Sequence, residues 1–264
     1  MGKILAITNQ KGGVGKTTTA INVAAALAAN DLKVLVIDSD PQGNATTGLG
    51  ATKDPDHPSL YHILLGSAEI PDAVLHTSFE GLDLVPGDKN LVGANLELVD
   101  SQKREFRLRE KVAVVRSMYD FILIDCPPAL DLLTLNALLA ADSVLVPIQC
   151  EFFALEGISE LMDTIARIRT SFEHPLAIEG ILLTMFDDRT NLTRQVANDL
   201  RDFFGDQVFE TVIPRSIRLA EAPSHGQSIL AYDVRSRGAE SYIKLAKEIL
   251  ENEQGRGKSA QSTR

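Results

Sequence analysis

A glycine-rich segment near the N-terminus carries the strongest chemical signal in the sequence. It runs as Lys11, Gly12, Gly13, Val14, Gly15, Lys16, Thr17 and Thr18. Glycines let successive backbone N–H groups approach an anion closely, the Lys16 ammonium suits the outer phosphates of a nucleotide, and the Thr17 hydroxyl suits Mg²⁺. The segment therefore predicts a phosphate-binding loop.

The neighbouring sequence supplies the strand and the helix that must position this loop. Apolar residues 4–7 precede it, and an alanine-rich stretch, roughly residues 17–29, follows it. A helix that begins there directs the positive end of its dipole at the same phosphates.

Two acidic segments each follow an apolar run. Asp38 and Asp40 come after residues 34–37, and Asp125 ends the run that starts at residue 121. Because the carboxyl ends of parallel strands share one edge of a sheet, we expect these carboxylates to lie beside the loop. Phosphoryl transfer depends mainly on positioning and charge, which carboxylates near Mg²⁺ provide.

Short β-rich runs alternate with helix-length segments along the chain. This alternation predicts an α/β fold with a doubly wound, mostly parallel sheet flanked by helices. Residues 1–251 are expected to form a single domain, and residues 252–264 a polar, disordered tail. The expected strands are residues 3–8, 34–38, 82–85, 121–125, 143–147 and 177–184.

Composition narrows the class of protein. The chain of 264 residues has a formal charge of −10, but residues 189–247 hold 9 Lys and Arg against 7 Asp and Glu. A surface for a polyanion is therefore expected in the C-terminal third. No apolar stretch is long enough to span a bilayer, and the two cysteines lack metal-ligand spacing, so we interpret Cys126 and Cys150 as structural.

The loop departs from the usual phosphate-binding pattern, since Gln10 stands where a glycine is expected. In this form, residues 11–18 resemble the deviant Walker A motif of the ParA/MinD ATPases. The resemblance implies a P-loop NTPase fold, ATP and Mg²⁺ as cofactors, and a homodimer that sandwiches two ATP molecules. In that family the lysine matching Lys11 crosses to the partner's nucleotide.

The same resemblance implies roles for further residues. Lys11, Lys16 and Asp40 would be catalytic, with Asp40 orienting the attacking water. Thr17, Asp38 and Asp125 would hold or support Mg²⁺. The remaining nucleotide contacts would come from the loop residues Gly12, Gly13, Val14, Gly15 and Thr18, and from Met185, Asp187 and Pro214 around the adenine.

Residues 213–224 are similar to the corresponding segment of chromosomal ParA (Soj-type) partition proteins, and this resemblance extends from residue 1 to about residue 250. It implies non-specific binding of double-stranded DNA by the ATP-bound dimer, with Arg189 and Arg218 as DNA contacts. It also implies weak ATP hydrolysis stimulated by a ParB-type centromere-binding protein. The expected location is the cytoplasm, on the nucleoid.

Two alternatives share the catalytic motifs. One is a MinD-like positioning ATPase on a membrane, and the other is a ParA-like ATPase that positions a different cargo. A membrane is not expected, because the amphipathic residues 241–250 suit packing against a core and a polar segment follows them.

Overall fold

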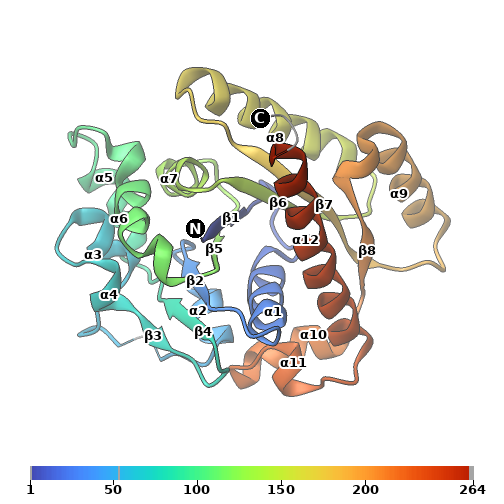
Figure 1. Cartoon of the computed structure of the whole chain (residues 1–264), viewed down its shortest axis with the longest axis horizontal. Coiled ribbons are helices and arrows are strands. Elements are labelled where there is room, and N and C mark those ends of the chain that lie inside the picture. The colour runs from blue at the N-terminus through green and yellow to red at the C-terminus, as the bar shows by residue number, and fades with distance from the viewer. Residues whose placement is uncertain (1, 53, 262–264) are drawn as a thin grey trace.

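The computed structural model describes residues 2–52 and 54–261, with the backbone alone for residues 254–261. In this part of the chain, one sheet of eight strands runs through the molecule in the order β3-β4-β2-β5-β1-β6-β7-β8 (Figure 1). All neighbouring strands are parallel except the pair β3 and β4. The predicted α/β class with a mostly parallel sheet is therefore confirmed. The strands are β1 (Lys3–Ile7), β2 (Val34–Asp38), β3 (Leu75–His76), β4 (Leu82–Val85), β5 (Phe121–Asp125), β6 (Ser143–Gln149), β7 (Ala177–Phe186) and β8 (Val208–Pro214).

Helices cover both faces of the sheet, which explains why the central strands are apolar throughout. Successive β1 side chains enter opposite cores: Leu5 and Ile7 pack with α1 and α12, whereas Ile4 and Ala6 pack with α6, α7 and α8. The first face carries α1 (Lys16–Ala28), α2 (Asn44–Gly48), α10 (Ile217–Glu221), α11 (Ile229–Tyr232) and α12 (Arg237–Gln261). The second carries α3 (Leu60–Leu65), α4 (Ile70–Ala73), α5 (Leu91–Glu97), α6 (Arg107–Val115), α7 (Leu132–Ala140), α8 (Ala154–Ser171) and α9 (Asn191–Phe204).

Strand β1 lies at the point where the direction of winding reverses. The chain leaves β1 toward β2 on one side and later returns to place β6 on the other. Ligands of doubly wound folds bind outside the carboxyl ends of the strands at such a point. The glycine-rich loop between β1 and α1 occupies this position.

The C-terminal boundary differs from the sequence prediction. Helix α12 continues to Gln261, so the expected boundary at residue 251 falls inside a helix. The side chain of Glu253 forms an ion pair with Lys3 of β1, which fastens this part of α12 to the sheet. Of the predicted tail, residues 262–264 lie outside the described residues.

The apolar face of α12 is buried, as expected from residues 241–250. Tyr242, Leu245 and Ile249 are at most 1% exposed and pack with α1 in one core. No helix in the described part of the chain combines the length and the apolar character needed to cross a bilayer.

Candidate active site

The glycine-rich loop opens toward solvent at the N-terminus of α1. Gly13 and Gly15 have φ values of 76° and 90°, which side chains rarely adopt. Gly15 caps α1 without any side-chain hydrogen bond, so the N–H groups of the first turn are free for an anion. This backbone fits a bound phosphate.

The two lysines of the loop differ in their surroundings. Lys16 is 7% exposed, and its ammonium donates to the carbonyl oxygen of Lys11 at 2.9 Å. Burial lowers the pKa of Lys16, while the negative charges of Asp125 and Asp40 oppose this effect. The Lys11 side chain is 43% exposed and forms an ion pair with Glu151 instead. Lys16 therefore belongs to the interior of the loop, and Lys11 to its outer surface.

Asp38 and Asp125 lie side by side at the carboxyl ends of β2 and β5. They are register partners in the parallel pair, and both are fully buried. Neither carboxylate oxygen of Asp125 has a hydrogen-bond partner of good geometry. Burial and the neighbouring Asp38 raise the pKa of Asp125 well above its usual range, although the nearby Thr17 hydroxyl and Lys16 lower it. A buried carboxylate of this kind requires a compensating cation.

The Asp38 carboxylate differs from that of Asp125, because neighbouring residues donate hydrogen bonds to both of its oxygens. Its carboxylate accepts the backbone N–H of Asp40 at 3.2 Å and both the N–H and the hydroxyl of Thr46 at 2.7 Å. Burial nevertheless raises the pKa of Asp38 to about 6, and the hydrogen bonds from Thr46 oppose the shift. Asp38 is therefore less available to a cation than Asp125.

These residues fit Mg²⁺ bound together with a nucleotide. Among the described residues, no three His, Cys, Asp or Glu side chains converge as a self-sufficient metal site. Mg²⁺ commonly takes only one or two carboxylates and completes its shell with phosphate oxygens and water. The unpartnered oxygens of Asp125, next to Lys16 and Thr17, suit such an ion.

A cavity of about 250 Å³ continues the site between the loop and the ends of β7 and β8. Met185 and Pro214 line it, as expected for residues near an adenine, and so does Thr18. Asp187 does not line it, because its carboxylate is turned to the Arg189 guanidinium at 2.6 and 2.8 Å. Two of the three residues expected near the adenine therefore line this cavity, and their contacts with the base stay a prediction.

The cavity is also lined by residues that the sequence did not single out as base contacts. The Thr184 hydroxyl donates to the carbonyl oxygen of Val14 at 2.8 Å and so ties the end of β7 to the loop. No local sequence pattern marks this contact, since the two residues are 170 positions apart. The remaining lining residues are Gly15, Ile213, Arg215, Ser216, Leu219, Ala220 and Tyr242.

Comparisons with known proteins agree with this geometry. The AAA domain family matches residues 2–178. The sporulation initiation inhibitor protein Soj of Bacillus subtilis is 53% identical over 252 residues, which cover 96% of this chain and 100% of that protein. The chromosome partitioning protein ParA of Caulobacter vibrioides is 50% identical over 256 residues and 96% of both chains.

The chain belongs to the ParA/Soj family. Membership confirms the predicted P-loop fold, the enzyme class of ATPase, and ATP and Mg²⁺ as cofactors. A solved structure named cobyrinic acid a,c-diamide synthase, from Mycobacterium smegmatis with bound ADP and magnesium, superposes with a TM-score of 0.84. It is 35% identical and covers 96% of both chains.

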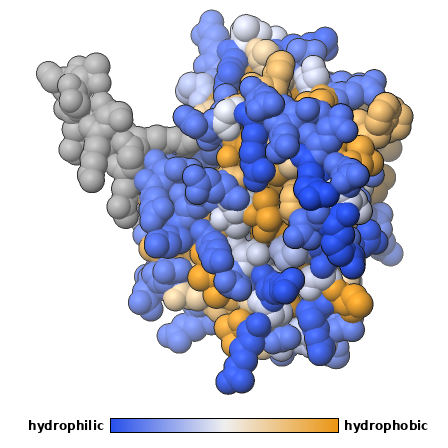
Figure 2. Space-filling view, turned by 90° about the vertical axis from the view of Figure 1, so that its right-hand side faces the viewer, coloured by the Kyte–Doolittle hydropathy of each residue, from blue (hydrophilic) through white to orange (hydrophobic). Residues whose placement is uncertain are grey.

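In this ParA/Soj family member, the two arginines expected to contact DNA lie at the surface. The side chains of Arg189 and Arg218 are 83% and 57% exposed. Arg189 forms a bidentate ion pair with Asp187. The hydrogen bonds from Arg189 lower the pKa of Asp187 to about 2. Arg218 lies 3.3 Å from Glu221 and over the ring of Tyr232. The side of the molecule with α9 and β8, at the right of Figure 1, is mostly hydrophilic with scattered apolar patches (Figure 2).

Proposed function

We propose that the chain is an ATP-driven switch in chromosome or plasmid segregation. ATP binding joins two chains, the dimer binds double-stranded DNA without sequence preference, and hydrolysis releases it. A ParB-type partner accelerates a hydrolysis that is weak in its absence. The identities of 53% and 50% to proteins named for sporulation control and chromosome partitioning support this role.

The observation that carries the proposal is the contrast between Lys11 and Lys16. Lys16 points into its own loop, where one ammonium suffices for the outer phosphates. The Lys11 side chain lies on the outer surface, 43% exposed and paired with Glu151. A second lysine in this position is explained if it serves a nucleotide held by a partner.

Within one chain, different residues bind the phosphates, the base and Mg²⁺ and orient the attacking water. The loop N–H groups and Lys16 hold the phosphates, and Met185 and Pro214 flank the base. Thr17, Asp38 and Asp125 would hold Mg²⁺, which balances the charge on the phosphates when bound. Asp40 orients the attacking water. Asp187 is paired with Arg189 and does not line the cavity for the base.

The proposed DNA surface consists of Arg189 and Arg218, with Arg215, Arg235, Arg237, Lys244 and Lys247 as additional contacts. Arginine pairs with phosphates in a salt-dependent and sequence-independent manner. In the dimer, two such surfaces act together, so DNA affinity depends on the nucleotide. The protein is then a cytoplasmic, nucleoid-associated one.

Retention on non-specific DNA with ATP tests the proposal. The wild type should be retained on the DNA, whereas Arg218→Glu should not. Asp40→Ala should stay bound to the DNA, because it does not consume the ATP. Arg109→Glu is a charge-matched control, since Arg109 is exposed on α6, on the other face of the sheet. An equal loss of DNA retention in Arg218→Glu and Arg109→Glu would contradict the proposed DNA surface.

The membrane alternative is less compatible with the packing of α12. The side chains that a membrane anchor would use, Tyr242, Leu245 and Ile249, are buried against the sheet. Co-sedimentation with anionic liposomes and ATP would reveal such binding directly. A different cargo remains compatible with the same motifs, and pull-down with a ParB-type protein separates these two roles.

A further inference from the structure

The loop that carries Asp40 is fastened at both ends to one carboxylate. Asp38 Oδ1 accepts the N–H of Asp40 at 3.2 Å, at the start of the loop. Asp38 Oδ2 accepts the N–H and the hydroxyl of Thr46 at 2.7 Å each, in the first turn of α2, the helix that follows the loop. Both Asp38 and Thr46 are completely buried. The position of the loop therefore depends on where the Asp38 carboxylate lies.

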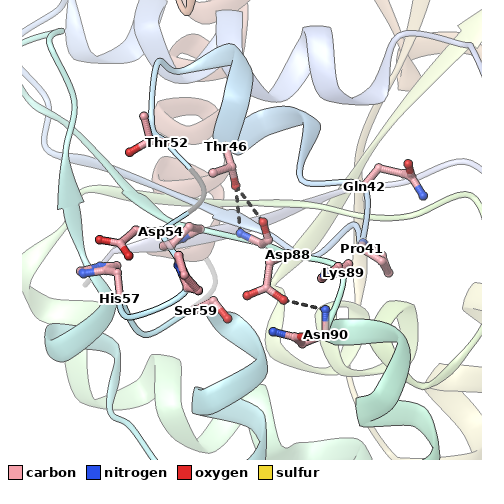
Figure 3. A pocket seen from close by; sticks show the side chains of 13 residues that line it. Pro41, Gln42, Thr46, Thr52, Asp54, His57, Ser59, Asp88, Lys89 and Asn90 are labelled. Atoms are coloured by element: carbon pink, nitrogen blue, oxygen red, sulfur yellow. Dashed lines mark hydrogen bonds between the residues drawn. The ribbon is translucent and has the colours of Figure 1, made fainter.

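The Thr46 hydroxyl connects this carboxylate to a third segment. While it donates to Asp38, it accepts the backbone N–H of Gly87 at 2.9 Å. Figure 3 shows dashed lines that mark hydrogen bonds of the labelled Thr46 side chain. Gly87 is the second residue after the end of β4. A Cβ atom on Gly87 would lie 2.4 Å from the carbonyl oxygen of Asp38 and 3.0 Å from its Cγ. The backbone of Gly87 thus packs directly against Asp38.

A cavity of about 520 Å³ lies on the outer side of the loop. Pro41 and Gln42, directly after Asp40, line it together with Thr46 and Gly87 (Figure 3). On this side, the loop is not held by dense packing. The buried hydrogen bonds through Thr46 therefore contribute to holding it in place.

Asp40 continues this arrangement inside the loop. Its carboxylate accepts the N–H of Gln42 at 2.9 Å, and its carbonyl oxygen accepts the N–H of Gly43 at 2.8 Å. These bonds make the loop one hydrogen-bonded unit between Asp38 and Thr46. Thr46 and Asp40 are therefore connected through the Asp38 carboxylate.

We propose that Thr46 is a positioning residue for Asp40. Its hydroxyl, anchored on Gly87, fixes the Asp38 carboxylate and with it the loop that places Asp40 for ATP hydrolysis. The proposal rests on the role assigned to Asp40 under the proposed function. It adds the segment after β4 to the parts of the chain that determine turnover.

The test compares ATP affinity with single-turnover hydrolysis in Thr46→Val, which keeps the shape and removes the hydroxyl. Hydrolysis falls about tenfold or more, as expected for a lost hydrogen bond to a charged group, whereas ATP affinity changes less than about threefold. Thr46→Ser restores hydrolysis to within about threefold of the wild type, because a serine hydroxyl makes the same bonds. Thermal unfolding of each variant verifies folding.

Thr19→Val is a matched control. Thr19 is equally buried, but its hydroxyl contacts Tyr242 rather than Asp38, so its removal leaves the ratio of hydrolysis to affinity unchanged. Full hydrolysis in Thr46→Val, or an equal loss of affinity and hydrolysis, overturns the proposal. If Thr46→Val does not fold, amide hydrogen exchange of the wild type decides: slow exchange at Asp40, Thr46 and Gly87 supports the network, and fast exchange contradicts it.

Asp40→Ala in the same assay separates the two levels of inference. If Asp40→Ala hydrolyses ATP normally, the role assigned to Asp40 is wrong. If Asp40→Ala is inactive while Thr46→Val is fully active, the role of Asp40 stands and the positioning role of Thr46 is wrong.

Discussion

The phosphate end of the site and the arginine surface differ in how far their charged side chains are buried and paired. At the phosphate end, Asp125 and Lys16 are buried, and Asp125 lacks hydrogen-bond partners. On the surface, Arg189 and Arg218 are exposed and each already contacts a carboxylate. A buried, incompletely paired charge gains much from a ligand, whereas an exposed, paired arginine must exchange one partner for another. Nucleotide binding should therefore dominate the energetics, and DNA binding should be weak per contact and depend on many contacts.

The largest effect is expected from the lysines of the loop. Lys16→Ala removes the buried ammonium and should weaken ATP binding by about 100-fold or more, because a buried charge-assisted contact is lost. Lys11→Ala should leave ATP binding within a few-fold and abolish ATP-dependent dimers instead. Fluorescent-nucleotide titration and light scattering measure both properties.

Similar losses of ATP affinity in Lys11→Ala and Lys16→Ala would contradict the assignment of Lys11 to a partner. Glu151→Gln provides a control for Lys11. It breaks the ion pair within the chain while leaving Lys11 in place, so dimers should form at least as readily as in the wild type.

A smaller effect is expected from Asp125 in the absence of nucleotide. Its folded-state pKa is raised, so the stability that it contributes is present below the unfolded pKa and is lost as pH rises through the folded one. Asp125→Asn should therefore be more stable than the wild type at pH 8, by about 2 kcal/mol, and this advantage should shrink toward pH 4. Thermal unfolding of the nucleotide-free proteins across this range measures it.

The same variant should lose the stabilisation that the wild type gains from Mg²⁺ with ADP. A pH-independent difference in unfolding, or equal stabilisation by Mg²⁺ and ADP, would show that Asp125 is not the buried charge that the cation compensates.

On the arginine surface, a single substitution should have a moderate effect. Arg218→Ala should weaken ATP-dependent DNA binding by about three- to tenfold and lower the slope of log affinity against log salt by about 1 per chain. Titration of a DNA duplex at several salt concentrations tests this. A changed affinity with an unchanged slope would mean that Arg218 acts without contacting a phosphate.

The smallest effect is expected from releasing an arginine from its own carboxylate. Asp187→Asn frees Arg189, and an exposed ion pair of this kind stabilises by less than about 1 kcal/mol. DNA affinity should rise about two- to fivefold, measured in the same titration. A decrease would indicate that Asp187 orients Arg189 for DNA rather than competing with it.

The phosphate end could be predicted from sequence because its parts are contiguous. Residues 11–18 follow β1, and Asp38 and Asp125 end strands whose apolar runs are unmistakable. Each segment alone places its residues at the carboxyl edge of the sheet. Tertiary packing adds their register, which puts Asp38 beside Asp125.

The base side could not be read in the same way, because its contacts join distant segments. Thr184 meets Val14, and Asp187 turns to Arg189, for reasons that no local pattern records. The six expected strands do not include β3 or β8. Strand β3 has only two residues, and Glu210 interrupts the apolar run of β8. The end of α12 differs from expectation because Glu253 pairs with Lys3, 250 positions away.

The most direct test of the central claim is the affinity of the wild type for non-specific DNA with ATP and with ADP, under otherwise equal conditions. A dimer held by two ATP molecules predicts binding at least about tenfold tighter with ATP, because two arginine surfaces then act together. Equal affinity with ATP and ADP would contradict the switch.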